Sequence, residues 1–392
     1  MIPFEKAVEI IINSAIELGT EEVILNNSLN RVLAQDVVSD VDMPSHNKAL
    51  MDGYVCRRQD LHNILEVIET IPAGKMPKKK IELNKCSMIM TGSVIPDGAD
   101  CVVKVEDVEN VSKKKIKVVG NDHENYICTK GQHIKKGEIV IKKGSLISPK
   151  HISILASVGI AKPLVYKQPK VGIIATGNEI VEPTKSPSVA QKRNSNSYQL
   201  YAQLKTVGAI PTYYGIVKDN KKAIDKAVKK ALVKNDVILV SGGVSMGLFD
   251  FVPEILKENS FNLLFEKVAL KPGKPTIFGT SAENKFCFGL PGNPVSTFVT
   301  FELFVKPFLY KMMGLNFKPL KTKAALNKAV SRKQTERREW LPVKFSDEGT
   351  VTPVIYYGSS HSTALCLADG LISIPQGVDE IEEDSLVTVR II

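Results

Sequence analysis

The first residues of the chain carry a helical spacing of apolar positions. Phe4, Val8 and Ile11 recur every three to four residues, with polar residues between them. This spacing matches the 3.6 residues of a helical turn and predicts an amphipathic helix. Pro3 near its start and Gly19 near its end are typical of helix boundaries. We therefore expect the first element to be a helix that buries one apolar face.

Residues 45–140 have a different pattern. Short stretches in which apolar and polar residues alternate, such as Asp100–Val105 and Lys115–Val119, are separated by turns rich in Gly, Pro and Lys. A period of two is typical of half-buried strands, so these residues predict a small β-rich domain. A strand at Ile139–Ile141 and a helix after Ser148 then predict a segment that returns from this domain.

Residues 170–313 alternate between apolar runs rich in β-branched residues and amphipathic stretches. This alternation predicts a doubly wound, mostly parallel sheet, because strands covered by helices on both faces are apolar throughout. The predicted strands are Val171–Ala175, Thr212–Val217, Val237–Val240, Leu263–Val268, Thr276–Phe278 and Phe286–Gly289. The predicted helices span 196–207, 221–233, 250–259 and 294–313. Ligands of such sheets bind at the carboxyl ends of the strands.

The C-terminal part, from about residue 317 to 392, consists of short apolar stretches separated by turns. This pattern predicts a small β-barrel or sandwich. The predicted strands are Trp340–Phe345, Val351–Pro353, Gly370–Ile374 and Leu386–Ile391. At about 150 residues per domain, a chain of 392 residues is expected to hold two or three domains.

The composition is that of a soluble globular protein, with 43% apolar and 24% charged residues. No apolar run approaches the roughly 18 residues that a membrane span needs, so we expect no membrane partner. The first residues lack a basic region followed by an apolar one, so we expect no secretory signal and a cytoplasmic protein. The six cysteines include no C-x-x-C pair and are interpreted as reduced thiols.

Lys and Arg number 52 against 42 Asp and Glu, which gives a net charge of +10. A basic balance suits nucleic acid, a membrane surface or an anionic small molecule. The lysine clusters, such as Lys78–Lys80 and Lys113–Lys115, are spread among short predicted strands and are not gathered on one helix with aromatic residues between them. We interpret them as solvated turns and expect no nucleic acid partner.

Three carboxylates stand at the ends of elements in the α/β region. Glu179 and Asp219 follow predicted strands, and Asp250 lies near the start of a predicted helix. Taken alone, Glu179 is an ordinary turn residue, and Asp219 or Asp250 is an ordinary helix cap. Because the carboxyl ends of parallel strands meet at one edge, we expect all three near one another. Carboxylates beside phosphate-binding backbone suit Mg²⁺, which takes one or two carboxylates plus phosphate oxygens.

Two backbone features suited to anions are predicted at the same edge. The run Ser241-Gly242-Gly243-Val244-Ser245 follows a buried strand, and its glycines let backbone N–H groups approach an anion. The run Leu290-Pro291-Gly292-Asn293-Pro294-Val295-Ser296 opens a helix, with Asn293 suited to the N-cap and Pro294 to the first turn. The N–H groups of a helix start attract phosphate or carboxylate. An ordinary tight turn and an ordinary capped helix are the alternatives.

Three lysines crowd the short stretch from residue 267 to 275. Lys267 and Lys271 share one face if the strand predicted there continues, and Lys274 follows closely. Cations gathered on the edge of an apolar sheet repel one another unless an anion joins them. We therefore expect an anion site at these lysines.

These motifs resemble those of the molybdopterin molybdenumtransferase family, to which the C-terminal domain of gephyrin is related. The resemblance rests on Ser241–Gly247 and Leu290–Ser296, and it continues at three further runs. These runs are Met51-Asp52-Gly53-Tyr54, Ile89-Met90-Thr91-Gly92-Ser93 and Leu270-Lys271-Pro272-Gly273-Lys274-Pro275. They occur in the family's order, and the chain has the length of the whole family.

The resemblance implies four domains and a homodimer. The expected domains are a discontinuous α+β domain at 1–44 and 141–169, a β-rich domain at 45–140, an α/β molybdopterin-binding domain at 170–316 and a C-terminal β-barrel at 317–392. The implied reaction inserts molybdate into adenylylated molybdopterin and releases AMP, with Mg²⁺ as cofactor. This is the last step of molybdenum cofactor biosynthesis, in which other proteins of the pathway act as partners.

The resemblance also assigns roles to residues of this sequence. Glu179, Asp219 and Asp250 would hold the cation, and Asp219 and Asp250 would act in catalysis with Lys267 and Lys271. Asp52 and Thr91 would reach in from the partner protomer as further catalytic residues. The residues expected to bind substrate are Ser241, Gly242, Gly243, Ser245, Lys274, Pro291, Gly292, Asn293, Pro294, Ser296, Arg338 (or Arg337) and Ser360.

Some positions depart from the common family pattern. Lys48-Ala49 stands where Asn-Ser is usual, Asn194 where an Asp is often seen, and Phe251 where a Tyr is often seen. The core set is intact, so we expect an active enzyme. Two other functions stay open: a molybdopterin adenylyltransferase, which usually consists of the α/β domain alone, and a non-catalytic scaffold like gephyrin.

Overall fold

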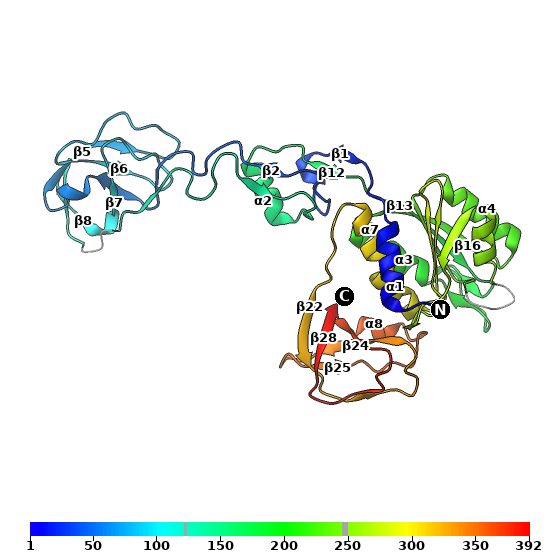
Figure 1. Ribbon diagram of the computed structural model, residues 1–392. Helices are drawn as coiled ribbons and strands as arrows, with labels where there is room; N and C mark the ends of the chain where they lie inside the picture. Colours follow the sequence, from blue (N-terminus) through cyan, green and yellow to red (C-terminus); the bar gives the residue numbers. More distant parts are fainter. Residues whose placement is uncertain (121–123, 245–249) are drawn as a thin grey trace. The chain divides into compact units, whose positions relative to one another are not determined.

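The structure is a computed structural model that describes residues 1–120, 124–244 and 250–392. These residues divide into two compact units (Figure 1), which are described separately. Unit 1 comprises Met1–Ala34, Gly144–Ser148 and Leu164–Ile392, and unit 2 comprises Gln35–Lys143 and Pro149–Pro163. The division into four domains remains a prediction.

Unit 2 is built on a six-stranded sheet with the order β7-β4-β6-β5-β9-β8, which confirms the predicted β-rich region. Its strands are β4 (Gly53–Cys56), β5 (Ile64–Ile71), β6 (Lys85–Ile89), β7 (Cys101–Lys104), β8 (Val108–Ser112) and β9 (Lys115–Val118). Side chains such as Leu65 and Ile116 form its buried core. A Cβ on Gly53 would lie 1.9 Å from the carbonyl oxygen of Val103, so β4 and β7 approach closely only because residue 53 is glycine.

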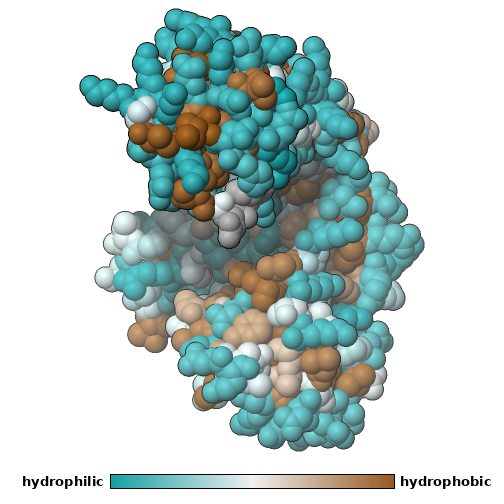
Figure 2. All heavy atoms as spheres, turned by 90° about the vertical axis from the view of Figure 1, so that its left-hand side faces the viewer, coloured by the Kyte–Doolittle hydropathy of each residue, from teal (hydrophilic) through white to brown (hydrophobic). Residues whose placement is uncertain are grey.

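The rest of unit 2 contains two pairs of short strands and one helix. β2 (Val37–Val38) pairs with β11 (Ile139–Ile141), and β3 (Lys48–Ala49) pairs with β10 (Ile127–Cys128). The helix α2 (Pro149–Ser157) begins where the sequence predicts it. Figure 2 shows hydrophilic side chains over most of the face that it presents, with apolar side chains gathered in patches.

Unit 1 contains a second six-stranded sheet, with the order β16-β13-β17-β21-β20-β18. The pairs β16–β13, β13–β17 and β17–β21 are parallel, whereas β20 and β18 form an antiparallel edge. The strands are β13 (Lys170–Thr176), β16 (Ile210–Val217), β17 (Val237–Ser241), β18 (Phe261–Phe265), β20 (Ile277–Ser281) and β21 (Phe286–Leu290). The predicted doubly wound, mostly parallel sheet is confirmed.

Helices cover both faces of this sheet because alternate strand residues point to opposite sides (Figure 1). Val171, Ile173 and Leu239 share one core with α1 (Phe4–Ser14), α3 (Asn196–Val207), α6 (Pro294–Thr300) and α7 (Lys306–Met312). Ile174, Ile238 and Val240 share the other core with α4 (Lys221–Leu232) and α5 (Val252–Glu258). No helix of the described residues is long and apolar enough to cross a membrane.

Two predicted elements are interrupted. The predicted helix 294–313 is divided by a π-helical turn at Phe301–Val305, just before Pro307, whose ring nitrogen has no hydrogen to donate to the preceding turn. The predicted strand 263–268 ends at Phe265. The backbone of Lys267 instead accepts from the N–H of Ile2, so the N-terminus of the chain supplies its partner.

The C-terminal part of unit 1 forms a third six-stranded sheet, with the path β19-β24-β26-β28-β22 and β25 paired to β24. The strands are β19 (Leu270–Lys271), β22 (Lys321–Ala325), β24 (Arg338–Phe345), β25 (Val351–Pro353), β26 (Gly370–Ile374) and β28 (Leu386–Ile391). All four strands predicted in this region are present. β19 pairs with β24 in parallel, so the stretch that holds Lys271 belongs to this sheet.

The core of unit 1 depends on Phe308, which is fully buried. Its ring centroid lies 5.6, 4.9 and 5.3 Å from those of Phe278, Phe286 and Phe288. We expect Phe308→Ala to destabilise unit 1 by about 3–5 kcal/mol, because it leaves a cavity among three rings. Urea unfolding and calorimetry both measure this loss of stability. Leu320→Ala, at a side chain that is 72% exposed, is the control and should change stability by less than about 0.5 kcal/mol. Equal effects of the two substitutions would contradict the assignment.

Candidate functional site

The carboxyl ends of β13, β17 and β21 open into a cavity of about 460 Å³. We call it the edge cavity. Many residues predicted from the sequence line it: Glu179, Asp219, Ser241, Gly242, Gly243, Asp250, Gly292, Asn293, Pro294 and Ser360. Pro291 and Ser296 are buried behind these residues. Ser245 lies outside the described residues. The sheet therefore brings together residues that are more than 100 positions apart in the chain.

The first wall of the edge cavity joins the ends of β13 and β16. The backbone N–H of Asn178 donates to Asp219 Oδ2 at 3.0 Å, and the N–H of Asp219 donates to Asn178 Oδ1 at 3.2 Å. Gly177 has φ of +150°, and a Cβ there would lie 2.7 Å from Glu179 Oε2. Glycine is therefore required for the chain to turn Glu179 toward this edge.

Negative charge is concentrated at this wall. Burial, and then the charges of Glu179 and Asp250, raise the pKa of Asp219, while the N–H of Asn178 opposes the shift. Lys192 Nζ lies 3.3 Å from Glu179 Oε1 and offsets part of the charge. Among the described residues, no three His, Cys, Asp or Glu side chains are grouped closely enough to hold a metal ion.

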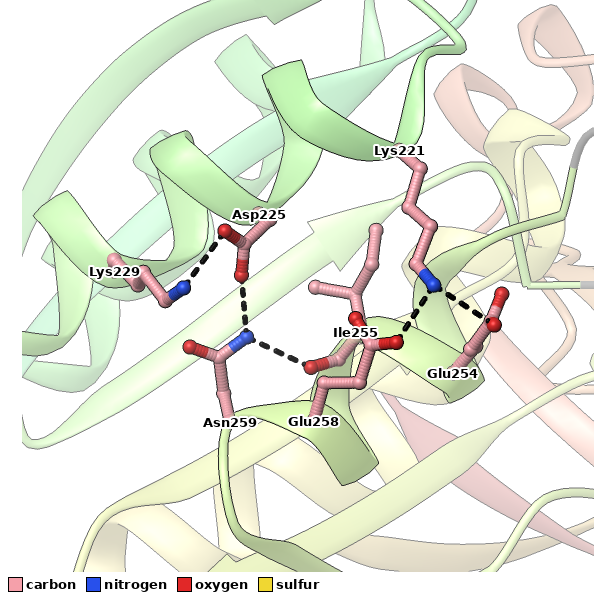
Figure 3. Close-up of polar contacts among 7 residues, drawn as sticks. All are labelled: Lys221, Asp225, Lys229, Glu254, Ile255, Glu258 and Asn259. Carbon is pink, nitrogen blue, oxygen red and sulfur yellow. Dashed lines mark hydrogen bonds and ion pairs between the residues drawn. The ribbon is translucent and has the colours of Figure 1, made fainter.

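The helices α4 and α5 carry Asp219 and Asp250 at their starts and are tied together by side chains (Figure 3). Lys221 Nζ contacts Glu254 at 2.8 Å and Glu258 at 2.6 Å. Asn259 donates to Asp225 at 2.7 Å, and Asp225 also accepts from Lys229.

The sequence alternative that Asp219 caps a helix is wrong, and Asp250 precedes the N-cap position of α5. Asn220 is the N-cap of α4 and accepts from the N–H of Ala223, and Phe251 occupies the N-cap position of α5. The two carboxylates thus precede the caps and line the cavity instead.

The second wall consists of the glycine turn after β17. Gly242 and Gly243 have φ of +95° and +64°, and a Cβ on Gly242 would lie 2.5 Å from the carbonyl oxygen of Thr176. This turn is therefore possible only with glycine. The buried side chain of Asn196 donates to Ser241 Oγ at 2.9 Å and to the carbonyl oxygen of Gly292 at 3.0 Å. One amide group on α3 thus holds the turns after β17 and β21 together.

The third wall is the start of α6. Asn293 is the N-cap residue of α6 and Pro294 its first residue, as predicted. The side chain of Asn293 makes no capping hydrogen bond, however, and it donates to Ser359 Oγ at 2.7 Å. The N–H of Val295 donates to the carbonyl oxygen of Ser359 at 3.1 Å. A loop of the C-terminal sheet region therefore uses donors of the helix start, and this docking brings Ser360 to the edge cavity.

The three lysines do not gather at the edge cavity. Lys271 Nζ pairs with the buried carboxylate of Glu339 at 2.8 Å and lines a second cavity of about 490 Å³. Arg332 lies 3.5 Å from the other oxygen of Glu339 in the same cavity. Lys267 and Lys274 line neither cavity, and the side chain of Lys274 is exposed. The predicted common face is wrong because the strand ends at Phe265.

Arg338 is the first residue of β24 and Arg337 directly precedes it, and their side chains contact different parts of unit 1. Arg338 donates to Glu5 at 2.6 Å and to Ser373 at 2.8 Å, and its guanidinium lies 5.6 Å from the ring of Phe4. This places Arg338 beside α1, in a separate cavity of about 340 Å³. Arg337 instead donates to the carbonyl oxygen of Leu270, next to Lys271.

In unit 2, Asp52 and Thr91 form a pair. The N–H and the hydroxyl of Thr91 both donate to Asp52 Oδ1, at 2.6 and 2.7 Å. These hydrogen bonds lower the pKa of Asp52, which keeps its carboxylate ionised. The side chains of Leu50 and Met51, which precede Asp52, are exposed.

Apart from Glu179, sequence reasoning missed the part of the edge cavity formed by residues 178–195, which we call the strap. Its short strands β14 (Ile180–Val181) and β15 (Lys192–Arg193) pair with each other, and Lys192, Arg193 and Asn194 line the cavity. Strands of two residues carry too little periodicity to be predicted. The adjacent cations Lys192 and Arg193 were the available signal.

Comparison with protein families gives three matches along the chain. The MoeA N-terminal region (domain I and II) matches residues 2–159, the probable molybdopterin binding domain matches residues 172–311, and the MoeA C-terminal region (domain IV) matches residues 324–392. The three regions follow one another in the order of a single family.

Relatives match over the whole chain. A molybdopterin molybdenumtransferase of Staphylococcus aureus is 35% identical over 388 residues, which cover 96% of this chain and 92% of that protein. One of Staphylococcus epidermidis is 35% identical over 401 residues, which cover 99% of this chain and 95% of that protein.

Solved structures agree with the fold. A crystal structure of a molybdopterin biosynthesis MoeA protein from Pyrococcus horikoshii is 33% identical with a TM-score of 0.83, and it covers 100% of this chain and 99% of that chain. A second structure of such a protein, from strain OT3 of this organism, is 29% identical with a TM-score of 0.86 and covers 100% of both chains. The predicted multidomain α/β fold is confirmed.

The raised pKa of Asp219 predicts a stability effect with a definite sign. Because the folded pKa lies above the ordinary value of 3.8, the group favours folding below that value, and this contribution is lost as the pH rises through the folded pKa. Asp219→Asn removes the penalised charge and keeps an oxygen to accept from Asn178. We expect it to raise the melting temperature at neutral pH by at most about 2–4 °C, since partial exposure keeps the gain below about 1 kcal/mol.

Calorimetry without added divalent cations, from neutral pH down to about pH 4, tests this expectation, and the gain should vanish at the acid end. Asp225→Asn is the control with the opposite sign, because Lys229 and then Asn259 lower the pKa of Asp225. It should lower the melting temperature at neutral pH. A lower melting temperature for Asp219→Asn at neutral pH would refute the electrostatic account.

Proposed function

The chain belongs to the molybdopterin molybdenumtransferase family, transferases of molybdenum cofactor biosynthesis, and we propose that it inserts molybdate into adenylylated molybdopterin and releases AMP. The observation that carries the proposal is the edge cavity. It combines carboxylates, a glycine turn and a helix start at the carboxyl ends of parallel strands. Cleavage of a phosphoanhydride depends mainly on positioning and charge stabilisation, which such groups supply.

The donor set of the edge cavity fits a hard divalent cation such as Mg²⁺. Its carboxylates supply oxygen ligands. Burial, and then the charges of Glu179 and Asp250, raise the pKa of Asp219, and a bound cation would offset both effects. Since no three described carboxylates are grouped as a ready metal site, one or two of Glu179, Asp219 and Asp250 would hold the ion together with phosphate oxygens of the substrate. The bound ion would neutralise charge that develops on the leaving phosphate.

The second cavity is suited to an oxyanion such as molybdate. Lys271, Arg332 and Lys333 line it, and Arg337 lies next to Lys271. The loop that carries Tyr356 and Gly358 on the side of this cavity carries Ser360 on the side of the edge cavity. The two cavities are therefore separated by one loop, which supports adjacent sites for the anion and for the phosphate-bearing substrate.

We further propose that a second copy of the chain contributes Asp52 and Thr91. Their hydrogen bonds hold the carboxylate ready as a fixed group at the surface of unit 2, beside the exposed Leu50 and Met51. Exposed apolar side chains that lie together at a surface are typical of interaction sites. The enzyme would work in the cytoplasm with other proteins of molybdenum cofactor biosynthesis.

The first test is the release of AMP from adenylylated molybdopterin in the presence of Mg²⁺, measured with and without molybdate. We expect release that depends on molybdate and is accompanied by active cofactor. Consumption of ATP with release of pyrophosphate would instead indicate an adenylyltransferase. Binding of the pterin by the folded protein without any turnover would indicate a scaffold.

Two substitutions test the assignment of the cavities. Asp250→Ala removes a carboxylate from the edge cavity, and Lys271→Ala removes a cation from the second cavity. Each should lower turnover at least tenfold, or about 1.4 kcal/mol of transition-state stabilisation, without loss of folded protein. Glu266→Ala and Lys257→Ala are matched controls, because these residues form an exposed ion pair that lines neither cavity. Near-normal turnover of both Asp250→Ala and Lys271→Ala would overturn the assignment.

A further inference from the structure

A cluster of side chains around Tyr213 connects the two strands of the strap with β16 and α3. Tyr213 is on β16, Tyr198 is on α3, Glu182 directly follows β14, and Asn194 directly follows β15. Tyr213 donates to Glu182 Oε1 at 2.7 Å and accepts from Asn194 Nδ2 at 2.8 Å. Tyr198 donates to Glu182 Oε2 at 3.0 Å. These side chains connect both strands of the strap to the body of the α/β sheet.

The two strands of the strap are also hydrogen-bonded to each other, so they move together. The N–H of Lys192 donates to the carbonyl oxygen of Glu179, and the N–H of Asn194 donates to that of Val181, each at 2.8 Å. Asn194 Oδ1 accepts from the N–H of Ser197 in the first turn of α3. The hydrogen bonds at Tyr213 therefore set where the strap presents Glu179 and Lys192 to the edge cavity.

The direction of each hydrogen bond in this cluster follows from which groups can donate. Burial and then the hydrogen bond to Glu182 raise the pKa of Tyr213, so its phenol stays protonated and has one hydrogen to give. Glu182 can only accept, and it takes that hydrogen. The remaining lone pairs of Tyr213 then need a donor, and Asn194 Nδ2 supplies it. Asn194 is 3% exposed, so no bulk water competes for this position.

An aspartate at position 194 would break this pattern. It could still accept from Ser197, but it has no hydrogen for Tyr213. The carboxylate oxygen introduced at position 194 and Glu182 Oε1 would then compete for the one hydrogen of Tyr213. The oxygen that loses this competition would have no donor in a place that excludes most water, which is costly. The asparagine is therefore the neutral partner that a glutamate at position 182 requires.

We propose that Glu182, Tyr213 and Asn194 are positioning residues that hold the strap against the edge cavity and so set the affinity for the phosphate-bearing ligand. This inference rests on the proposed function for the nature of the ligand. The hydrogen bonds of the cluster are made within the chain and involve no ligand. The cluster acts through Glu179 and Lys192 and does not touch the substrate.

The test is a swap of charge between positions 182 and 194. Asn194→Asp should speed hydrogen exchange of the strap amides at least tenfold. It should also raise the KM for adenylylated molybdopterin and the Kd for AMP at least fivefold, while kcat changes less than twofold. Glu182→Gln should stay close to wild type, because its amide can accept from Tyr213 and donate to Tyr198. The double variant should return to wild type, because Tyr213 then donates to the carboxylate introduced at position 194 and accepts from the amide introduced at position 182.

A control separates the local effect from general destabilisation. Asn259→Asp places a second carboxylate beside Asp225 and loosens the α4–α5 contact, so it should lower the melting temperature without faster exchange in the strap. Unchanged strap exchange in Asn194→Asp, or no recovery in the double variant, would overturn the inference. Wild-type protein that binds no AMP would count against the proposed function, whereas the exchange data would still decide the role of the cluster.

Discussion

The alignment of three parallel strand ends is the constraint on which the site depends. In the register of the sheet, Ala175 of β13 lies beside Ser241 of β17, and Ser241 lies beside Leu290 of β21. All three strands therefore stop at one level, and the turns that follow them share one edge. Those turns bend back over the sheet only where glycine relieves the contact with neighbouring backbone, as at Gly242. The buried amide of Asn196 then joins two of the turns, so the edge cavity is a consequence of register together with one hydrogen-bonding side chain.

Charge is divided between the two cavities of unit 1. The edge cavity gathers carboxylates, and burial, followed by the charges of Glu179 and Asp250, raises the pKa of Asp219. The second cavity gathers Lys271, Arg332 and Lys333 around the buried Glu339. A cation and an anion that bind side by side stabilise each other, whereas either charge alone would be attracted to only one of these cavities.

The sequence pattern predicted those helices and strands whose determining contacts lie within one continuous segment of the chain. The helix over residues 196–207 has the predicted bounds, since its apolar period and its C-terminal Gly208 belong to one continuous segment. The lysine stretch was misjudged because its backbone partners, Ile2 and β24, come from the two ends of the chain. Asn293 occupies the predicted N-cap position, but its side chain donates to Ser359, 66 residues later, which the sequence did not indicate. No window of sequence contains these partners, so the carboxylates were predicted at the site and the lysine placement was not.

The pairing of Lys271 with Glu339 has a consequence for how an oxyanion binds. An ammonium already held at 2.8 Å by a buried carboxylate is not free to offer its full charge. An incoming dianion must either displace Glu339 or share Lys271 with it, and Glu339 cannot move to water because it is 4% exposed. Sharing places a second negative group beside the carboxylate, which raises the need for further donors such as Arg332 and Arg337. The second cavity therefore favours a ligand whose several oxygens can reach several donors at once, as a tetrahedral oxyanion does, over an anion with a single acceptor atom.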